Sequence, residues 1–364
     1  MNLEENMKKK LIIGIFFILS ISIFAKETYV KGKILSILKE EELADDEYLT
    51  SMTDFQVEIM EGEEKGKILT ISHPTYREKQ HNLFFKPNMN VVVYIDADDY
   101  YIIERDRRGS LYLLVSLFLG LTLFIAKKQG LKAILSLGIT GFLIFKLMIP
   151  GIIIGFSPIL ISIVILSISS IVTIFFMTGF NSKGIIAILG TLGGVIFAGL
   201  LSIFFSKTMG ITGYTTIESI NYASLIKNIN LKELVSTGVI IGSAGAVMDV
   251  SMSISSALSE IKSHKPHITS LELYNSGMSI GRDIIGTMIN TLILAYIGGS
   301  LFTIMILTIQ QNDFPDIRIF NFEFVGVEFL RAFCGSIGIL IAVPLTSFLA
   351  SKIHIQNKER KKDF

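Results

Sequence analysis

Two stretches in the second half of the chain place ionisable and amide side chains among residues that otherwise suit a membrane helix. The first contains Asp249, and the second contains Arg282, Asp283 and Asn290. A carboxylate near the middle of a membrane helix costs about 2.5–3.5 kcal/mol to insert, so such groups usually line a substrate or ion pathway. A buried carboxyl can also carry a proton, because desolvation raises its pKa while a nearby arginine lowers it. The alternative is structural: Asp249 hydrogen-bonds neighbouring helices together, and Arg282 and Asp283 form an ion pair at a helix start.

Helical spacing gathers these polar residues on one side of each predicted helix. In the segment 233–259, small and then polar side chains recur every three or four positions. They are Gly238, Gly242, Gly245, Asp249, Ser253 and Ser256. The glycines allow a neighbouring backbone to approach closely, and Gly190 and Gly194 form a similar small-residue stripe earlier in the chain.

In the following helix, Asp283, Thr287 and Asn290 share a side, with Arg282 next to them. The two helices run antiparallel. Counting about 1.5 Å per residue from their common end puts Asp249 and Asn290 at nearly the same depth, so we expect Asp249 to lie against the Thr287–Asn290 turn. The predicted transport or proton-relay site comprises Asp249, Ser253, Ser256, Arg282, Asp283, Thr287 and Asn290.

The composition is that of a multi-pass membrane protein whose main partner is the lipid bilayer. Half of the residues (50%) are hydrophobic, the mean hydropathy is +0.58, and long apolar runs recur from residue 111 to residue 350. The net charge of +1 and the dispersed basic residues argue against a nucleic-acid partner. The single cysteine, Cys334, rules out a disulfide within the chain and a thiolate metal site, and we expect no metal ion and no cofactor.

The N-terminal part of the chain divides into a targeting segment and a small β domain. Residues 1–25 combine consecutive lysines with an apolar run, which is typical of a signal peptide or of an uncleaved signal anchor. Residues 26–108 are charged and contain five short segments of alternating polarity, separated by turn-type residues. This pattern predicts a small domain that resembles a β-barrel.

Residues 109–351 form the predicted transmembrane domain, an α-helical bundle of about seven spans, or eight helices if the N-terminal signal is uncleaved. The predicted spans are 110–126, 131–149, 157–179, 183–206, 233–259, 281–308 and 325–350. Residues 150–157 form either a re-entrant segment or a surface turn. Basic residues recur in alternate connecting segments and in the tail, residues 352–364. By the positive-inside rule, the β domain is extracytoplasmic and the C-terminus is cytoplasmic.

Two long strings around the polar residues carry a family resemblance. They are Gly245-Ala-Val-Met-Asp249-Val-Ser-Met-Ser-Ile-Ser-Ser256 and Ser276-Gly-Met-Ser-Ile-Gly-Arg282-Asp283-Ile-Ile-Gly-Thr287-Met-Ile-Asn290-Thr291. In these strings the chain resembles the YibE/F-like family of bacterial multi-pass membrane proteins. The resemblance extends from the end of the β domain to about residue 350. It implies a permease of the bacterial cytoplasmic (inner) membrane, and it implies no particular substrate.

Transport or export of a small substrate or ion is the function that these residues favour, with proton coupling through Asp249. The alternative is a non-transporting scaffold whose β domain binds a membrane or envelope partner, and in that case the polar residues only lock the helices together. The sequence contains no His-Glu-x-x-His and no phosphate-binding loop, and a lone mid-membrane Asp249 lacks the second carboxylate of an aspartyl protease, so we do not expect an enzyme. The direction of transport and the oligomeric state are left open.

Overall fold

The computed structural model describes residues 29–43, 48–77, 83–97, 99–215, 217–221, 229–309 and 315–359. The chain falls into two compact units, and each is described by itself. One unit contains a β-sheet and the first part of the helix that follows it, up to Ile125, and the other contains the helices from Ala126 onward. The predicted signal segment, residues 1–25, lies outside the described residues.

The sheet has five antiparallel strands, which are β1 (Tyr29–Glu42), β2 (Leu49–Ile59), β3 (Ile68–Tyr76), β4 (Asn90–Asp96) and β5 (Asp99–Arg105). Their order is β3-β2-β1-β4-β5, so β1 is the central strand of the sheet. Alternation along β2 buries Phe55, Val57 and Ile59 on the core face. Strand β1 passes so close to this core that Gly32 leaves no room for a side chain. A Cβ added there would lie 2.7 Å from Val57 and 2.9 Å from Val93.

The sheet is open, and the expected barrel-like closure is not confirmed. Strands β3 and β5 are the two edges, and they approach one another without joining the hydrogen-bonded ladder. Register irregularities on either side of Ser36 and Ile37 bend β1, which curls the sheet. Strand β5 has only 7 residues and pairs with β4 alone, so the curled sheet has no continuous ring of paired strands.

Six helices are long and apolar enough to cross a membrane in the part of the chain that is described. They are Arg108–Ile154, Pro158–Thr178 (α4), Ser182–Thr208 (α5), Leu231–His264 (α7), Ser270–Gly299 (α8) and Glu323–Ile353, which lies within α11 (Glu323–Glu359). The first combines α2 (Arg108–Leu143), a π-helical stretch (Ile144–Met148) and α3 (Ile149–Ile154). The remaining helices are short: α6 (Ile217–Asn221), α9 (Leu301–Ile309) and α10 (Asp316–Ile319). These spans make the chain a multi-pass membrane protein.

The expected count of about seven spans is not confirmed, because the first two predicted spans are joined in one helical stretch that has a kink inside it. The predicted spans 110–126 and 131–149 both fall within Arg108–Ile154, which has 47 residues. Inside it, Lys127 has non-helical dihedral angles, φ 48° and ψ −123°, at the basic point between the two apolar runs. The two predicted spans therefore correspond to two helical segments that meet at a kink at Lys127.

Helix α8 begins at Ser270, well before the expected start of that span at residue 281. Thr269 and Glu272 form a capping box, in which the Thr269 hydroxyl accepts a hydrogen bond from the Glu272 amide and the Glu272 carboxylate accepts one from the Thr269 amide. This cap adds about three turns to the start of the helix. Arg282 and Asp283 therefore lie in the body of α8 and not at a helix start.

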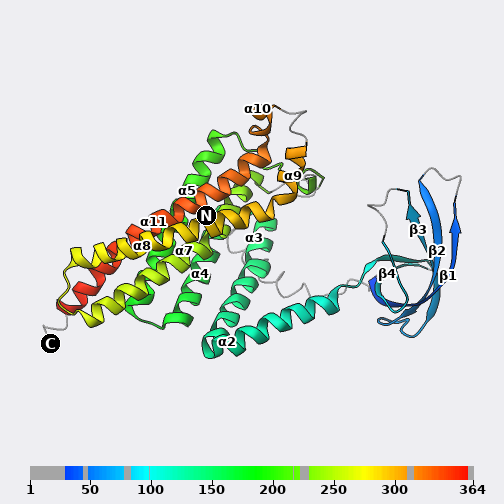
Figure 1. Ribbon diagram of the computed structural model, residues 1–364, viewed down its shortest axis with the longest axis horizontal. Helices are drawn as coiled ribbons and strands as arrows, with labels where there is room; N and C mark the ends of the chain where they lie inside the picture. Colours follow the sequence, from blue (N-terminus) through cyan, green and yellow to red (C-terminus); the bar gives the residue numbers. More distant parts are fainter. Residues whose placement is uncertain are drawn as a thin grey trace, which may run out of the picture. The chain divides into compact units, whose positions relative to one another are not determined.

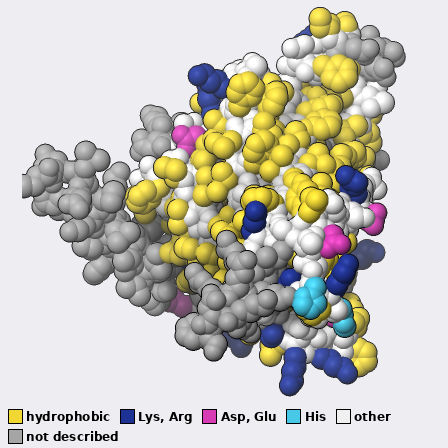
Figure 2. Space-filling view, turned by 90° about the vertical axis from the view of Figure 1, so that its left-hand side faces the viewer, with side chains coloured by type: hydrophobic (Ala, Val, Ile, Leu, Met, Phe, Trp, Pro, Cys, Tyr) yellow, Lys and Arg dark blue, Asp and Glu magenta, His cyan; other side chains and the backbone are white. Residues whose placement is uncertain are grey.

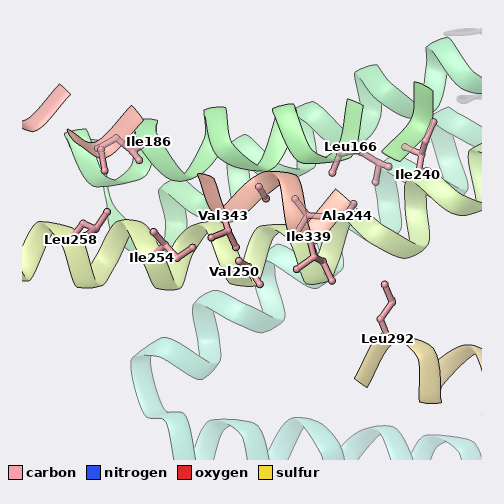
Figure 3. Close-up of a cluster of buried hydrophobic side chains, with 14 of the residues drawn as sticks. Leu166, Ile186, Ile240, Ala244, Val250, Ile254, Leu258, Leu292, Ile339 and Val343 are labelled. Atoms are coloured by element: carbon pink, nitrogen blue, oxygen red, sulfur yellow. The ribbon is translucent and has the colours of Figure 1, made fainter. Parts of the chain in front are cut away.

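The largest hydrophobic core lies among the helices that run side by side in Figure 1, mainly α5, α7 and α11. Side chains from these helices, including Ile186, Ile254 and Val343, are fully buried and meet in the cluster of Figure 3. Leu292 of α8 lies at the edge of that cluster in the same view. Helix α8 joins this core through Leu273 and Leu292.

The outer surface of the helices is apolar over a broad area. Large exposed hydrophobic side chains include Leu200, Phe204 and Phe333. Figure 2 shows one face on which hydrophobic side chains predominate, with lysine, arginine and histidine side chains mostly toward its lower edge. Exposed apolar surface of this extent is expected where the protein contacts lipid.

Candidate functional site

Asp249 lies on the exposed side of α7, about midway along the helix. Its neighbours Val247 and Val250 are fully buried in the core, so the helix turns Asp249 outward. Ser253, one turn further on, is also exposed, and Ser256 is half-buried. Within the described ranges, none of these three polar side chains has a hydrogen bond or an ion pair.

Helix α8 presents the other predicted residues on a side that faces away from the bundle. Its buried residues are Leu273, Gly277, Gly281 and Leu292. Only 11% of its most apolar stretch is buried, against 56% in α5 and in α7. The opposite side is exposed and polar. We call its exposed residues the α8 polar face: Ser279, Arg282, Asp283, Gly286, Thr287 and Asn290.

Helices α7 and α8 run antiparallel, and their register matches the predicted residues in depth. Two close approaches define this register: Gly242 with Tyr296, and Leu258 with Gly277. Asp249 on α7 and Thr287 on α8 each lie about midway between them. The depth expected for Asp249 therefore agrees with the helix pairing. A side-chain contact between Asp249 and the Thr287–Asn290 turn stays a prediction.

The hydroxyl groups on α8 differ from the charged and amide groups in how they are satisfied. Thr287 donates to the Ile284 carbonyl oxygen at 2.9 Å, and Thr291 donates to the Thr287 carbonyl oxygen at 2.8 Å. Such bonds to the preceding turn satisfy a hydroxyl without any outside partner. Asp249 and Asn290 have no equivalent bond among the described residues. The Asp249 carboxylate can accept a proton or a cation, and the Asn290 amide can donate or accept a hydrogen bond.

Arg282 and Asp283 are also exposed, and neither has an ion pair in the described part of the chain. They follow one another in sequence, so they point in directions about 100° apart around the helix. The two side chains add a strong donor and a strong acceptor to the surface that contains Asn290. The α8 polar face therefore presents charges of both signs at membrane depth.

The predicted packing glycines fall into two groups. Gly190, Gly194 and Gly242 lie against other helices, where an added Cβ would meet Thr346, Val247 and Tyr296 respectively. At Gly238 an added Cβ would be 3.6 Å from Arg331, which is ordinary contact, and at Gly245 it would meet no atom within 4 Å. The first group permits close helix contact, whereas Gly245 adds open space next to Asp249.

A Gly-x-Ser-x-Gly pattern, the signature of many serine hydrolases, occurs at Gly277-Met-Ser279-Ile-Gly281. In those enzymes the serine sits on a strained turn between a strand and a helix. Here the pattern lies inside α8, and its glycines pack against α11: a Cβ added to Gly277 would be 2.8 Å from Cβ of Ser347. The pattern therefore reflects helix packing. Nor do three or more His, Cys, Asp or Glu side chains gather into a potential metal site in the portion of the chain that is described.

A second polar group, outside the predicted site, lies where α7, α8 and α11 meet. Arg331 donates through Nη1 to Glu328 Oε1 at 2.8 Å. Arg331 Nε and Tyr296 Oη are buried, and neither has a hydrogen-bond partner among the residues described. The spacing of Glu328 and Arg331 predicts their pairing. Nothing in the sequence marks Tyr296, because only the packing shows that Gly242 leaves room for its ring.

Comparison with protein-family models found one match, to the family described as YibE/F-like protein, over residues 114–356. The matched region includes α7 and α8, and with them every residue of the predicted site. Comparison with curated proteins and with solved structures found no match.

Proposed function

We propose that this chain transports a small substrate or ion across a membrane, starting from the premise that it belongs to the YibE/F-like family, whose model matches more than half of it. The observation that carries the proposal is that Asp249 and Asn290 are both exposed on spanning helices. Neither side chain has a hydrogen-bond or ion-pair partner among the described residues. Unpaired polar groups at membrane depth are costly unless water, an ion or a substrate reaches them.

The position of Asp249 along α7 supports a role as a proton or ion relay. Helix α7 has 34 residues, which is about 51 Å at 1.5 Å per residue. The hydrocarbon core of a bilayer is about 30 Å thick, so a residue midway along the helix lies within it. Binding a proton or a cation neutralises the carboxylate there. We assign Arg282, Asp283 and Asn290 to the positioning of the substrate or ion.

We further propose that the sheet is extracytoplasmic and that α11 ends in the cytoplasm of a bacterial cell, at the inner membrane. Lys262 and Lys265 at the α7–α8 turn and Lys352 near the end of α11 support this orientation. In a Cys334→Ser background, a thiol introduced at His267 should be labelled by a membrane-impermeant reagent only after the cells are opened. Labelling of that turn in intact cells would contradict the proposed orientation.

Asp249→Asn is expected to abolish transport while leaving the protein in the membrane at normal abundance. The amide keeps the size and much of the hydrogen bonding of the carboxyl, but it can carry neither a proton nor a negative charge. Asp249→Leu should be equally inactive and at least as abundant, because it also removes the insertion cost. The measurements are growth of a deletion strain complemented with each variant, proton flux into proteoliposomes under an imposed gradient, and membrane abundance.

Glu260→Gln is the matched control for Asp249→Asn. It makes the same chemical change on the same helix, but Glu260 lies near the end of α7, exposed and 2.9 Å from His264. We expect wild-type growth and flux from this variant. Full activity of Asp249→Asn at normal abundance would overturn the transport proposal.

A scaffold that binds an envelope partner through its sheet is the second candidate function. A row of tyrosines across β1, β4 and β5 favours it. The ring centroids of Tyr29 and Tyr94 are 4.9 Å apart, and those of Tyr94 and Tyr101 are 6.5 Å apart. Tyr29 and Tyr101 are exposed, so the row offers a stacking surface to a polymer or peptide. If the chain is a scaffold, Tyr101→Ala should fail to restore growth of the deletion strain and Asp249→Asn should restore it. If the chain is a transporter, Asp249→Asn should fail to restore growth.

A further inference from the structure

We propose that the α8 polar face is an interface with a second copy of this chain, in which Arg282 of each copy pairs with Asp283 of the other. The second copy then completes the site. The role of this interface in transport rests on the proposed function, because Arg282 and Asp283 belong to the proposed site. The argument that the interface exists does not depend on transport.

The first step is that no described part of its own bundle covers the α8 polar face. In the described part of the chain, α8 packs mainly against α7, α11 and α9, and its buried residues all lie on the other side. Arg282, Asp283 and Asn290 are exposed and have no hydrogen bond or ion pair with any described residue. Lipid tails cannot satisfy an arginine, an aspartate and an asparagine, so a polar partner is required.

The second step is the arrangement of side chains around the helix. At about 100° per residue, Ser279 and Gly286 fall close to one line along α8, and Arg282 and Asp283 fall roughly 50° to either side of it. A Cβ added to Gly286 would meet no atom within 4 Å, so another helix can approach closely there. The face therefore has a midline of small residues with a positive charge on one side and a negative charge on the other.

The third step is that this pattern is complementary to itself. A two-fold axis along the membrane normal brings equal depths of the two copies together and sets the left side of each face against the right side of the other. Arg282 and Asp283 differ in depth by only about 1.5 Å. Each Arg282 then opposes the partner's Asp283, and two reciprocal ion pairs form. Asn290, roughly 30° from the midline on the same side as Asp283, adds an amide to the interface.

This complementarity is what selects a second copy as the occupant. A different helix would need its own acidic and basic residues at matching depths, whereas a second α8 supplies both. Charged pairs of this kind contribute most when they are shielded from water, as they are between two membrane helices. Small residues on the midline let the two helix backbones come close enough for the pairs to form.

Cross-linking of the full chain in native membranes tests the interface. Cys334→Ser removes the only cysteine, and Ser279→Cys or Gly286→Cys then places a thiol on the midline. Oxidation should link two copies into a dimer that survives denaturing electrophoresis without a reductant. Leu189→Cys is the matched control, because Leu189 is exposed on α5 and adjoins Gly190, which lies against α11 and α7. We expect dimer yields at least about tenfold higher from the midline positions than from Leu189→Cys.

Exchange of charges tests whether the proposed pairs hold the interface. In the Gly286→Cys background, Arg282→Asp alone and Asp283→Arg alone should each lower the dimer yield by about tenfold, because like charges then oppose each other. Co-expression of the two variants with different tags should restore cross-linking between the tags, and the double variant should restore it within one kind of chain. Recovery on co-expression also shows that each single variant folds.

Three outcomes would overturn the proposal. The dimer yields from Gly286→Cys and Leu189→Cys could be equal, the dimer yield could be unchanged by Arg282→Asp and by Asp283→Arg, or Gly286→Cys could be cross-linked to a different protein. The result is separable from the transport test, because Asp249 lies on α7 and takes no part in the pairs. If Asp249→Asn retains full activity and also gives a normal dimer yield, the transport proposal is contradicted and the interface proposal is still supported.

Discussion

Replacing Gly194 by alanine is expected to destabilise the helical unit by about 2–3 kcal/mol. Gly194 lies where α5 crosses α7 and α11. An added Cβ would be 2.7 Å from Val247, 2.8 Å from the Gly338 carbonyl oxygen and 3.0 Å from Ala342. The Gly338 oxygen belongs to the backbone and cannot rotate away, so α5 and α11 must move apart. Their separation weakens the contacts of the main hydrophobic core.

Gly245→Ala is the matched control, because it makes the same change in another helix of the bundle. A Cβ added to Gly245 would meet no atom within 4 Å, and alanine is favoured over glycine inside a helix by about 1 kcal/mol. In detergent, Gly194→Ala should melt several degrees below the wild type, and Gly245→Ala should melt at or above it. Equal melting temperatures for the two variants would show that α5 and α11 separate without cost.

The second large effect is expected from Glu323→Ala at the start of α11. Glu323 Oε1 accepts hydrogen bonds from the backbone amides of Thr212 and Gly213, both at 2.7 Å, and its Oε2 accepts one from the Thr212 hydroxyl at 2.7 Å. Bonds to a charged acceptor contribute about 1.5–3 kcal/mol each, and exposure of this loop reduces their sum. We expect a local loss of about 3 kcal/mol, measured as roughly 100-fold faster hydrogen exchange at these two amides.

Glu323→Gln separates the charge of the side chain from its shape. It keeps one acceptor oxygen for the two amides, so exchange at Thr212 and Gly213 should be intermediate. Amides in the α7–α8 turn should exchange as in the wild type, because that turn lies at the other end of α7. If Glu323→Ala leaves exchange unchanged, the loop is held by its own backbone, in which Gly213 has φ 93° and lies against Leu231.

The membrane class and the sheet were predictable because both depend on short-range patterns. An apolar run long enough to span a bilayer has few other stable structures available to it in water. Five of the six observed spans lie close to predicted spans or contain them. Alternation along β2 likewise identified its buried face. The early start of α8 has a local cause as well, the capping box at Thr269, and the kink at Lys127 lies between the predicted spans 110–126 and 131–149.

Periodicity also predicted which polar residues share a face and a depth. A helix has a fixed rise and rotation per residue, so Asp249 must lie with Ser253, and Asp283 with Asn290, whatever surrounds them. The antiparallel register of α7 and α8, set by contacts such as Gly242 with Tyr296, agrees with the depth obtained by counting residues. The family resemblance reached from the same strings is confirmed by the match over residues 114–356.

What each face packs against was decided only by the tertiary structure. Gly194 and Gly245 both belong to small-residue stripes of predicted membrane helices, so the sequence pattern does not distinguish them. In the structure, Gly194 is enclosed by α7 and α11, whereas Gly245 adjoins open space. The rotation of α8 about its own axis is likewise set by α11, which is distant in sequence and fills the small-residue side at Gly277 and Gly281. Because that side is committed to the bundle, the opposite side, with Arg282, Asp283 and Asn290, faces outward. Helical periodicity determines that these residues share one face of α8, and only long-range packing determines the direction in which that face points.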